Sequence, residues 1–320
     1  MKNNLFYYAT SELSQDAFIC YLLSFAMKEY ENRDPNLASC AREFLRKMMG
    51  DKCPENIEVT EIERQHKKID VLVTVNEKMY IIIEDKTFSK QHGNQIDEYK
   101  KLLIKENKPE QDIHCVYFKP VAQDHPEQGG VVNITRNEML AIFNNYKSSN
   151  QIYIDYVERI RDIDRLASAF KGTPIEKWDK CIYNGFFDYL TSRGIVDISK
   201  DFSWDSGRGT PVLWWYSLDG QNIRKGLLKN YIKSIDLKLS GDTIAIIISV
   251  KDSSGINEVE LFRQQLQKYI NEANLGIKTP LTKAKKHMQI GSVKFNEENY
   301  LDQISKMEML IKKIERGIPY

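Results

Sequence analysis

Three charged residues stand at the ends of two apolar segments in a pattern suited to phosphate chemistry. Asp70 lies at the start of the apolar run of residues 69–75, and Glu84 and Lys86 follow the run of residues 79–83. Carboxylate oxygens are hard ligands for Mg²⁺ or Mn²⁺, and these ions keep waters that a substrate phosphate can displace. A divalent ion acidifies a bound water and balances charge on the pentavalent phosphate, while a neighbouring ammonium orients the water. These residues therefore suffice for phosphodiester hydrolysis.

The spacing of the two acids predicts that they face each other across a β-hairpin. Both runs are rich in β-branched residues, and a hairpin that turns symmetrically about Glu77 places Asp70 opposite Glu84. Directly opposed Cβ atoms lie about 4.5–5.5 Å apart, where two carboxylates repel each other unless a cation joins them. The period of two places Lys86 on the face of Glu84 and points the Asp85 side chain away, although its backbone carbonyl can still reach an ion. A two-residue turn would instead move one carboxylate to the opposite face.

The elements predicted around the hairpin form an α/β fold. Amphipathic spacing predicts helices over residues 12–25 and 36–49, and alternation predicts a strand over residues 57–65. A helix over 95–107, a strand over 113–118, and helices over 137–145 and 152–170 follow the hairpin. This order indicates a mixed sheet covered by helices. Charged residues are also common where apolar strands reach the surface, so a purely structural role is the alternative for the D…ExK pattern alone.

The second half of the chain has an α+β pattern. Its predicted elements are strands over 212–216, 232–239, 243–250 and 288–295, and helices near 259–273 and over 297–316. We place a soft boundary near the end of the long predicted helix and expect a core over residues 1–165 and a C-terminal α+β region over residues 166–320.

Composition excludes several classes of protein. The 320 residues carry a net charge of +1, so nucleic-acid binding would have to come from a local patch. Five scattered cysteines without C-x-x-C spacing indicate neither a disulfide framework nor a zinc site. The apolar runs are too short for a membrane span and no signal peptide is visible, so we expect a cytoplasmic protein without a membrane partner. The chain has neither a P-loop nor a G-x-S-x-G motif.

Residues 8–120 resemble the PD-(D/E)XK nuclease superfamily, in particular its branch with a downstream Q-x-x-x-Y motif. The motifs that carry the resemblance are Ile69-Asp70, Glu84-Asp85-Lys86 and Gln95-x-x-x-Tyr99. The opening segment Thr10-Ser11-Glu12-Leu13-Ser14 also resembles a little-characterised bacterial group in which an N-terminal helix supplies another acidic residue. The family often has a proline where this chain has Ile69, at a position that tolerates many residues. The resemblance implies a restriction-endonuclease-like mixed central sheet flanked by helices.

The resemblance also implies roles for individual residues. Asp70 and Glu84 would bind Mg²⁺ or Mn²⁺ with help from the Asp85 carbonyl, and Lys86 would position the attacking water. Glu12 would add a carboxylate to the metal, directly or through water; stabilisation of a helix dipole is its alternative role.

Further candidates surround these residues. Gln95 and Tyr99 lie four apart on one predicted helix face, where they would hold a phosphate or orient the lysine; a packed tyrosine with an exposed glutamine is the alternative. The candidates for contacts to nucleic-acid phosphates are Lys67, Lys68, Lys90 and His92. An ordinary solvated strand end explains the first two of these lysines almost as well.

We therefore predict a metal-dependent nuclease that acts on DNA, in defence or DNA processing. Its C-terminal region is expected to recognise the substrate, a partner protein or a second copy in a homodimer. One alternative is a non-cleaving nucleic-acid- or protein-binding module on a nuclease-like fold. Another is a structural or oligomerising protein whose C-terminal half carries the function.

Overall fold

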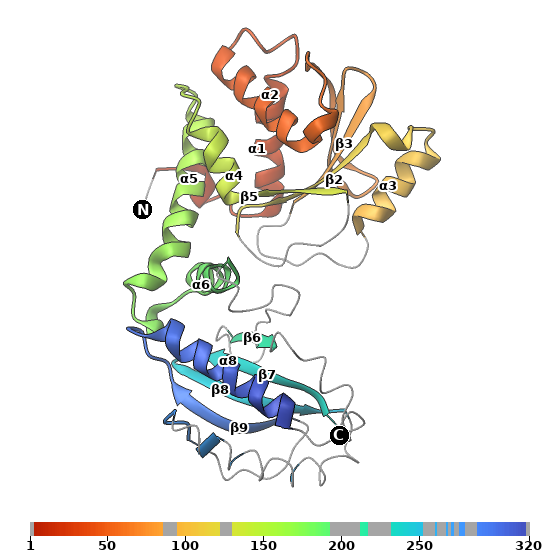
Figure 1. The fold of residues 1–320 in the computed structure, drawn as a ribbon. Coiled ribbons are helices and arrows are strands. Elements are labelled where there is room, and N and C mark those ends of the chain that lie inside the picture. Colours follow the sequence, from red (N-terminus) through yellow and green to blue (C-terminus); the bar gives the residue numbers. More distant parts are fainter. Residues whose placement is uncertain are drawn as a thin grey trace. The chain divides into compact units, whose positions relative to one another are not determined.

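The chain divides into two compact units, Met1–Leu166 and Ala167–Tyr320 (Figure 1). The computed structural model describes residues 3–85, 95–121, 130–192, 212–216, 232–251, 275–278 and 287–317, and positions 260, 267, 270 and 271. Each unit is built around its own buried core. A separate role for the second unit is still a prediction.

A five-stranded mixed sheet in the order β1-β2-β3-β4-β5 forms the centre of the first unit. Its strands are β1 (Val59–His66), β2 (Ile69–Val75), β3 (Met79–Asp85), β4 (Ile113–Lys119) and β5 (Val131–Thr135). The first three strands pair antiparallel, and β4 and β5 add to the sheet in parallel. A parallel neighbour needs a crossover connection, which α3 (Gln95–Lys105) contributes between β3 and β4.

Helices cover both faces of this sheet (Figure 1). One face packs in a common core with α1 (Glu12–Ser24), α2 (Pro35–Met49), α4 (Arg136–Phe143) and α5 (Gln151–Ser168). The other face packs against α3. Alternation along the strands makes this division possible, because Ile81 and Ile83 enter the first core whereas Tyr80 and Ile82 enter the second. The predicted α/β fold, a mixed sheet flanked by helices, is confirmed.

The second unit contains a four-stranded antiparallel sheet in the order β6-β7-β8-β9. Its elements are α6 (Lys180–Ser192), β6 (Val212–Tyr216), β7 (Ile232–Ser240), β8 (Thr243–Val250), β9 (His287–Lys294) and α8 (Tyr300–Gly317). Side chains of α6, α8 and the sheet share one core, exemplified by Phe186, Leu237 and Ile311. Most of the helix predicted near 259–273 lies outside the described residues.

Short 3₁₀ helices complete the described structure. They are η1 (Leu5–Tyr7), η2 (Gly50–Lys52), η3 (Glu110–Asp112), η4 (Ala169–Lys171) and η5 (Ile175–Lys177). Within the described ranges, no helix combines the length and the apolar character that a lipid bilayer requires of a spanning segment.

Candidate active site

The β2–β3 hairpin has the predicted register. The strands pair symmetrically about Glu77, and Val71 with Ile83 is the last pair. Asp70 and Glu84 are the next residues along the two strands, so both acids stand at the same end of the hairpin. We call the end formed by Asp70, Glu84 and Asp85 the strand end.

Asp70 is held against β3 by the backbone. Its Oδ2 atom accepts a hydrogen bond of 3.0 Å from the backbone N–H of Asp85, and its Oδ1 atom accepts one of 3.4 Å from Nε2 of Gln65. The N–H of Asp85 belongs to the peptide that follows Glu84. The Asp70 carboxylate therefore lies directly beside the end of β3, as a shared ion site requires.

Glu84 belongs to a row of polar side chains that crosses the sheet. It is fully buried and pairs in register with Tyr117 of β4, which in turn pairs with Asn133 of β5. Register partners share a face of a sheet, and Tyr117 lies in the core beside α3. Lys119, two residues beyond Tyr117, faces the same way and is only 2% exposed. We call Glu84, Tyr117, Asn133 and Lys119 the polar row.

Three members of the polar row are not among the residues predicted for the site. Tyr117 lies in a predicted apolar strand that ends before Lys119, and Asn133 lies in no predicted element. The available signal was weak: a polar residue every second position in residues 117–119, at the end of an apolar run. Only the parallel pairing of β3, β4 and β5 brings these side chains beside Glu84.

Gln95 and Tyr99 lie on the α3 side of the sheet. Nε2 of Gln95 donates a hydrogen bond of 3.1 Å to Oη of Tyr99, so the predicted shared helix face is confirmed. Tyr99 is buried in the core that also contains Tyr117, and Gln95 is half-buried. The pair thus faces the same side of the sheet as the polar row.

The Asp85 side chain points to the opposite side of the sheet and meets α1. Its Oδ1 atom accepts a hydrogen bond from Nε2 of Gln15, whose Oε1 atom accepts one of 3.3 Å from Oη of Tyr156. Gln15 and Tyr156 are both buried. Asp85 therefore points away from the face of Glu84, as predicted, and enters a buried chain of hydrogen bonds.

Carboxylates of α1 approach Asp85 closely enough to affect its ionisation. Burial raises the pKa of Asp85 well above its usual value, and the negative charges of Asp16, Glu12 and Asp70 raise it further, while the hydrogen bond from Gln15 acts in the opposite direction. Glu12 is the first residue of α1, and its negative charge acts on Asp85 at the strand end. Asp16, one turn later and buried, was not predicted.

Replacing Asp85 with asparagine is expected to raise the melting temperature in EDTA at pH 8 by about 3 °C or more. Asparagine keeps an oxygen for Gln15 and removes a carboxylate from among like charges. Because the pKa of Asp85 is raised, the folded protein keeps the Asp85 proton at a pH where the unfolded chain has released it. The free energy of unfolding of the wild type therefore falls as the pH rises above about 4. The difference between wild type and Asp85→Asn in thermal melts should therefore grow from pH 5 to pH 8. A constant difference would contradict this assignment.

Of the residues predicted to contact phosphates, the structure describes Lys67 and Lys68. Lys67 forms an ion pair with Glu106, and Lys68 is exposed. Both occupy the turn between β1 and β2 with positive φ angles of 48° and 81°. The other predicted cations, Lys86, Lys90 and His92, lie outside the described residues.

The donor atoms at the strand end suit a hard divalent cation. Asp70 and Glu84 offer carboxylate oxygens, whereas the Asp85 carboxylate, whose Oδ2 atom is buried without a hydrogen-bond partner, lies on the α1 side of the sheet. Oxygen ligands of this kind favour Mg²⁺ or Mn²⁺ over the softer metals. Across the part of the chain that the structure describes, no three His, Cys, Asp or Glu side chains are grouped closely enough to hold a metal by themselves. An ion here would therefore also use backbone oxygen, water or substrate.

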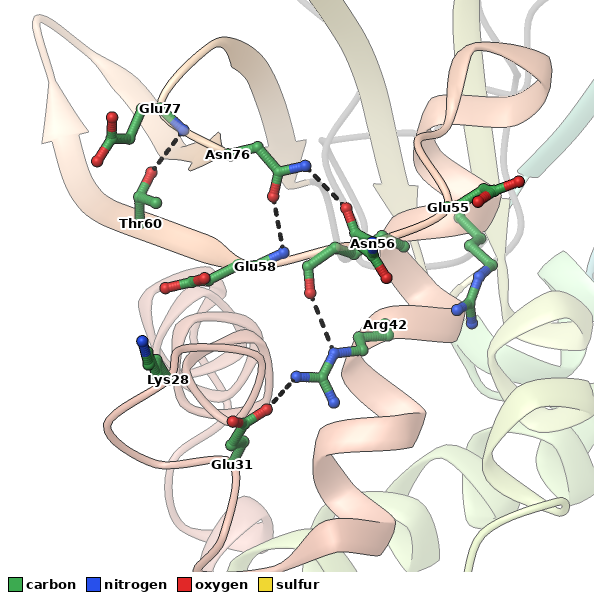
Figure 2. Close-up of a pocket in the computed structure, with 11 residues that line it drawn as sticks. Lys28, Glu31, Arg42, Glu55, Asn56, Glu58, Thr60, Asn76 and Glu77 are labelled. Carbon is green, nitrogen blue, oxygen red and sulfur yellow. Dashed lines mark hydrogen bonds and ion pairs between the residues drawn. The ribbon is translucent and has the colours of Figure 1, made fainter.

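A polar pocket of about 620 Å³ lies at the other end of the hairpin (Figure 2). Asn76 and Glu77 of the turn line it. Arg42 points into it but is engaged, because it donates hydrogen bonds of 3.1 Å to the carbonyl of Ile57 and 2.5 Å to Glu31. The pocket is thus distinct from the strand end, and Arg42 within it is already paired with Glu31.

A family model matches slightly more than half of the chain. Residues 10–184 match a family model described as the PD-(D/E)XK nuclease superfamily. The matched range contains all strands of the first sheet and every residue of the strand end. No match was found among curated proteins or among solved structures.

Proposed function

Because this chain belongs to the PD-(D/E)XK nuclease superfamily, we propose that it is a divalent-metal-dependent enzyme that hydrolyses phosphodiester bonds of DNA. Its mixed five-stranded sheet flanked by helices has the restriction-endonuclease-like architecture. The observation that best supports the proposal is the Asp70 carboxylate bonded to the Asp85 N–H, beside a fully buried Glu84. Two acids on adjacent strand ends are costly unless a cation is shared between them.

The proposed metal ligands are oxygen atoms of the strand end. Carboxylates of Asp70 and Glu84 and the backbone carbonyl of Asp85 would hold Mg²⁺ or Mn²⁺, and Glu12 would contribute directly or through water. When bound, the ion supplies Lewis-acid stabilisation of the charge that develops on the phosphate. The rigid β2–β3 ladder fixes the two acids before the substrate arrives, which reduces the cost of organising them during the reaction.

The remaining predicted residues would act on the water and the substrate. Lys86 would orient the attacking water. The hydrogen-bonded pair of Gln95 and Tyr99 would hold a phosphate oxygen or orient that lysine. The residues proposed to contact flanking phosphates are Lys67, Lys68, Lys90 and His92. Release of Lys67 from Glu106 would be part of such a contact.

We also propose a cellular setting for this activity. The enzyme would act in the cytoplasm, in defence or DNA processing. The second unit would recognise the substrate, a partner protein or a second copy of the chain.

Cleavage assays with defined metals test the proposed function. Purified protein is incubated with plasmid, linear duplex, single-stranded DNA and RNA in Mg²⁺, Mn²⁺ or EDTA. We expect DNA to be cleaved with either metal and to stay intact in EDTA. Cleavage that persists in EDTA would overturn the proposed metal dependence. DNA binding without cleavage in either metal would instead support a non-cleaving module, and cleavage of RNA alone would change the substrate.

A further inference from the structure

Lys119 is a lysine buried on the side of the sheet that carries the polar row. It is the last residue of β4 and is 2% exposed, and its Nζ atom lies 5.1 Å from the centroid of the Tyr117 ring. Lysine is almost never fully buried without nearby groups that compensate its charge. The ring of Tyr117 is one of the groups beside this ammonium, through a cation–π contact. Lys119 therefore holds a positive charge inside the protein, on the face of the sheet that carries Tyr117 and Glu84.

The strand register places Lys119 close to the acids of the strand end. Tyr117 pairs with Glu84, and the following residue, Phe118, pairs with Asp85. From the spacing of strands and of residues along a strand, the Cα atom of Lys119 is about 8 Å from that of Glu84. The Lys119 ammonium lies near the ring of Tyr117, and Tyr117 is the register partner of Glu84.

An ammonium at this position changes the charge balance of the site. It opposes the binding of a divalent cation at Glu84 and Asp70, and it favours the approach of a negative phosphate to the same place. In a poorly hydrated environment both effects are stronger than in water, because the screening is weaker. The expected effects of losing this charge on metal binding and on DNA binding are thus opposite in sign.

We propose that Lys119 is a positioning residue of the nuclease site, a second cation that weakens metal binding and strengthens binding of the phosphodiester backbone. This inference rests on the proposed function, because it takes the strand end as the place where metal and phosphate meet. In this role the Lys119 charge changes the electrostatic potential at Glu84, its neighbour in the polar row.

The test compares Lys119→Met and Lys119→Arg with wild type in two binding measurements that need no cleavage. Mn²⁺ affinity is measured with the metal alone by electron paramagnetic resonance, and affinity for a labelled DNA duplex is measured in EDTA by fluorescence anisotropy. Lys119→Met should bind Mn²⁺ about five- to thirtyfold more tightly and DNA about three- to tenfold more weakly. Lys119→Arg, which keeps the charge, should restore both affinities.

Lys108 offers a matched control, since its ammonium lies 4.4 Å from the centroid of the Tyr80 ring on the same unit. Lys108→Met should leave both affinities unchanged. Unchanged affinities in Lys119→Met would overturn the inference, as would a parallel loss of both affinities with a lower melting temperature. If Lys119→Met does not fold, Lys119→Gln keeps a polar group and gives the same comparison. A wild type that never cleaves would remove the proposed function, whereas opposite shifts in the two affinities would still support the role of Lys119.

Discussion

Replacing Glu84 with glutamine is expected to lower kcat for DNA cleavage by about 10³-fold or more and to weaken Mn²⁺ binding. The Glu84 side chain is fully buried at the end of β3, one residue beyond the last hairpin pair. Glutamine keeps the shape of the side chain and removes its negative charge, so the loss of activity and of Mn²⁺ affinity measures what the carboxylate contributes as a charged ligand. The measurements are single-turnover cleavage of a linear duplex in Mg²⁺ and Mn²⁺ binding by the protein alone.

A second buried glutamate controls for the substitution itself. Glu308 of α8 is 5% exposed and lies in the second unit, so Glu308→Gln repeats the chemical change far from the strand end in sequence. We expect its cleavage rate to stay near that of wild type. If Glu84→Gln kept more than about a tenth of wild-type activity while remaining folded in thermal melts, Glu84 would not be a metal ligand.

Replacing Lys86 with methionine is expected to reduce kcat by about 10²–10³-fold while Mn²⁺ binding is retained or becomes tighter. The proposed task of this ammonium is to orient the attacking water, and its positive charge opposes the metal. A loss of rate without a loss of metal affinity separates this role from that of a ligand. Rate constants at saturating DNA and Mn²⁺ titrations of the same preparations provide the two values.

Lys100 is a suitable lysine for comparison. It lies on α3, where its Nζ atom is 2.9 Å from Oε1 of Glu110, and no site role is proposed for it. Lys100→Met should therefore cleave DNA at about the wild-type rate. Equal rates for Lys86→Met and wild type would remove Lys86 from the mechanism. A variant of Lys86 that lost Mn²⁺ binding together with activity would instead indicate damage to the metal site.

Local patterning was enough to predict the hairpin that presents the two acids. β-Branched residues and alternation of the core-facing positions specify β2 and β3, and a register error would have moved every core-facing side chain to the other face. Similarly, the ends of α2 are encoded locally: Asp34 accepts hydrogen bonds from the first turn and Gly50 adopts a φ angle of 58°. The four-residue spacing placed Gln95 and Tyr99 on one face for the same reason.

Two described elements could not be predicted from local pattern. β5 is a strand of only 5 residues and is mostly half-buried, so its periodicity is weak, and its pairing with β4 stabilises it. The helix α6 contains Gly185, an unfavourable helix residue in isolation. A Cβ atom at that position would lie 1.9 Å from the carbonyl oxygen of Ala167, so glycine permits a close approach that only the packed chain reveals.

Local sequence pattern specifies the hairpin and its two acids, because strand and helix periodicities are properties of neighbouring residues. The packing of distant segments selects the residues that join them. Parallel strand pairing places Tyr117 beside Glu84, and the packing of α1 on the sheet brings Asp16 toward Asp85. These contacts join residues more than thirty positions apart, and they depend on strand order and helix placement, which no local spacing encodes.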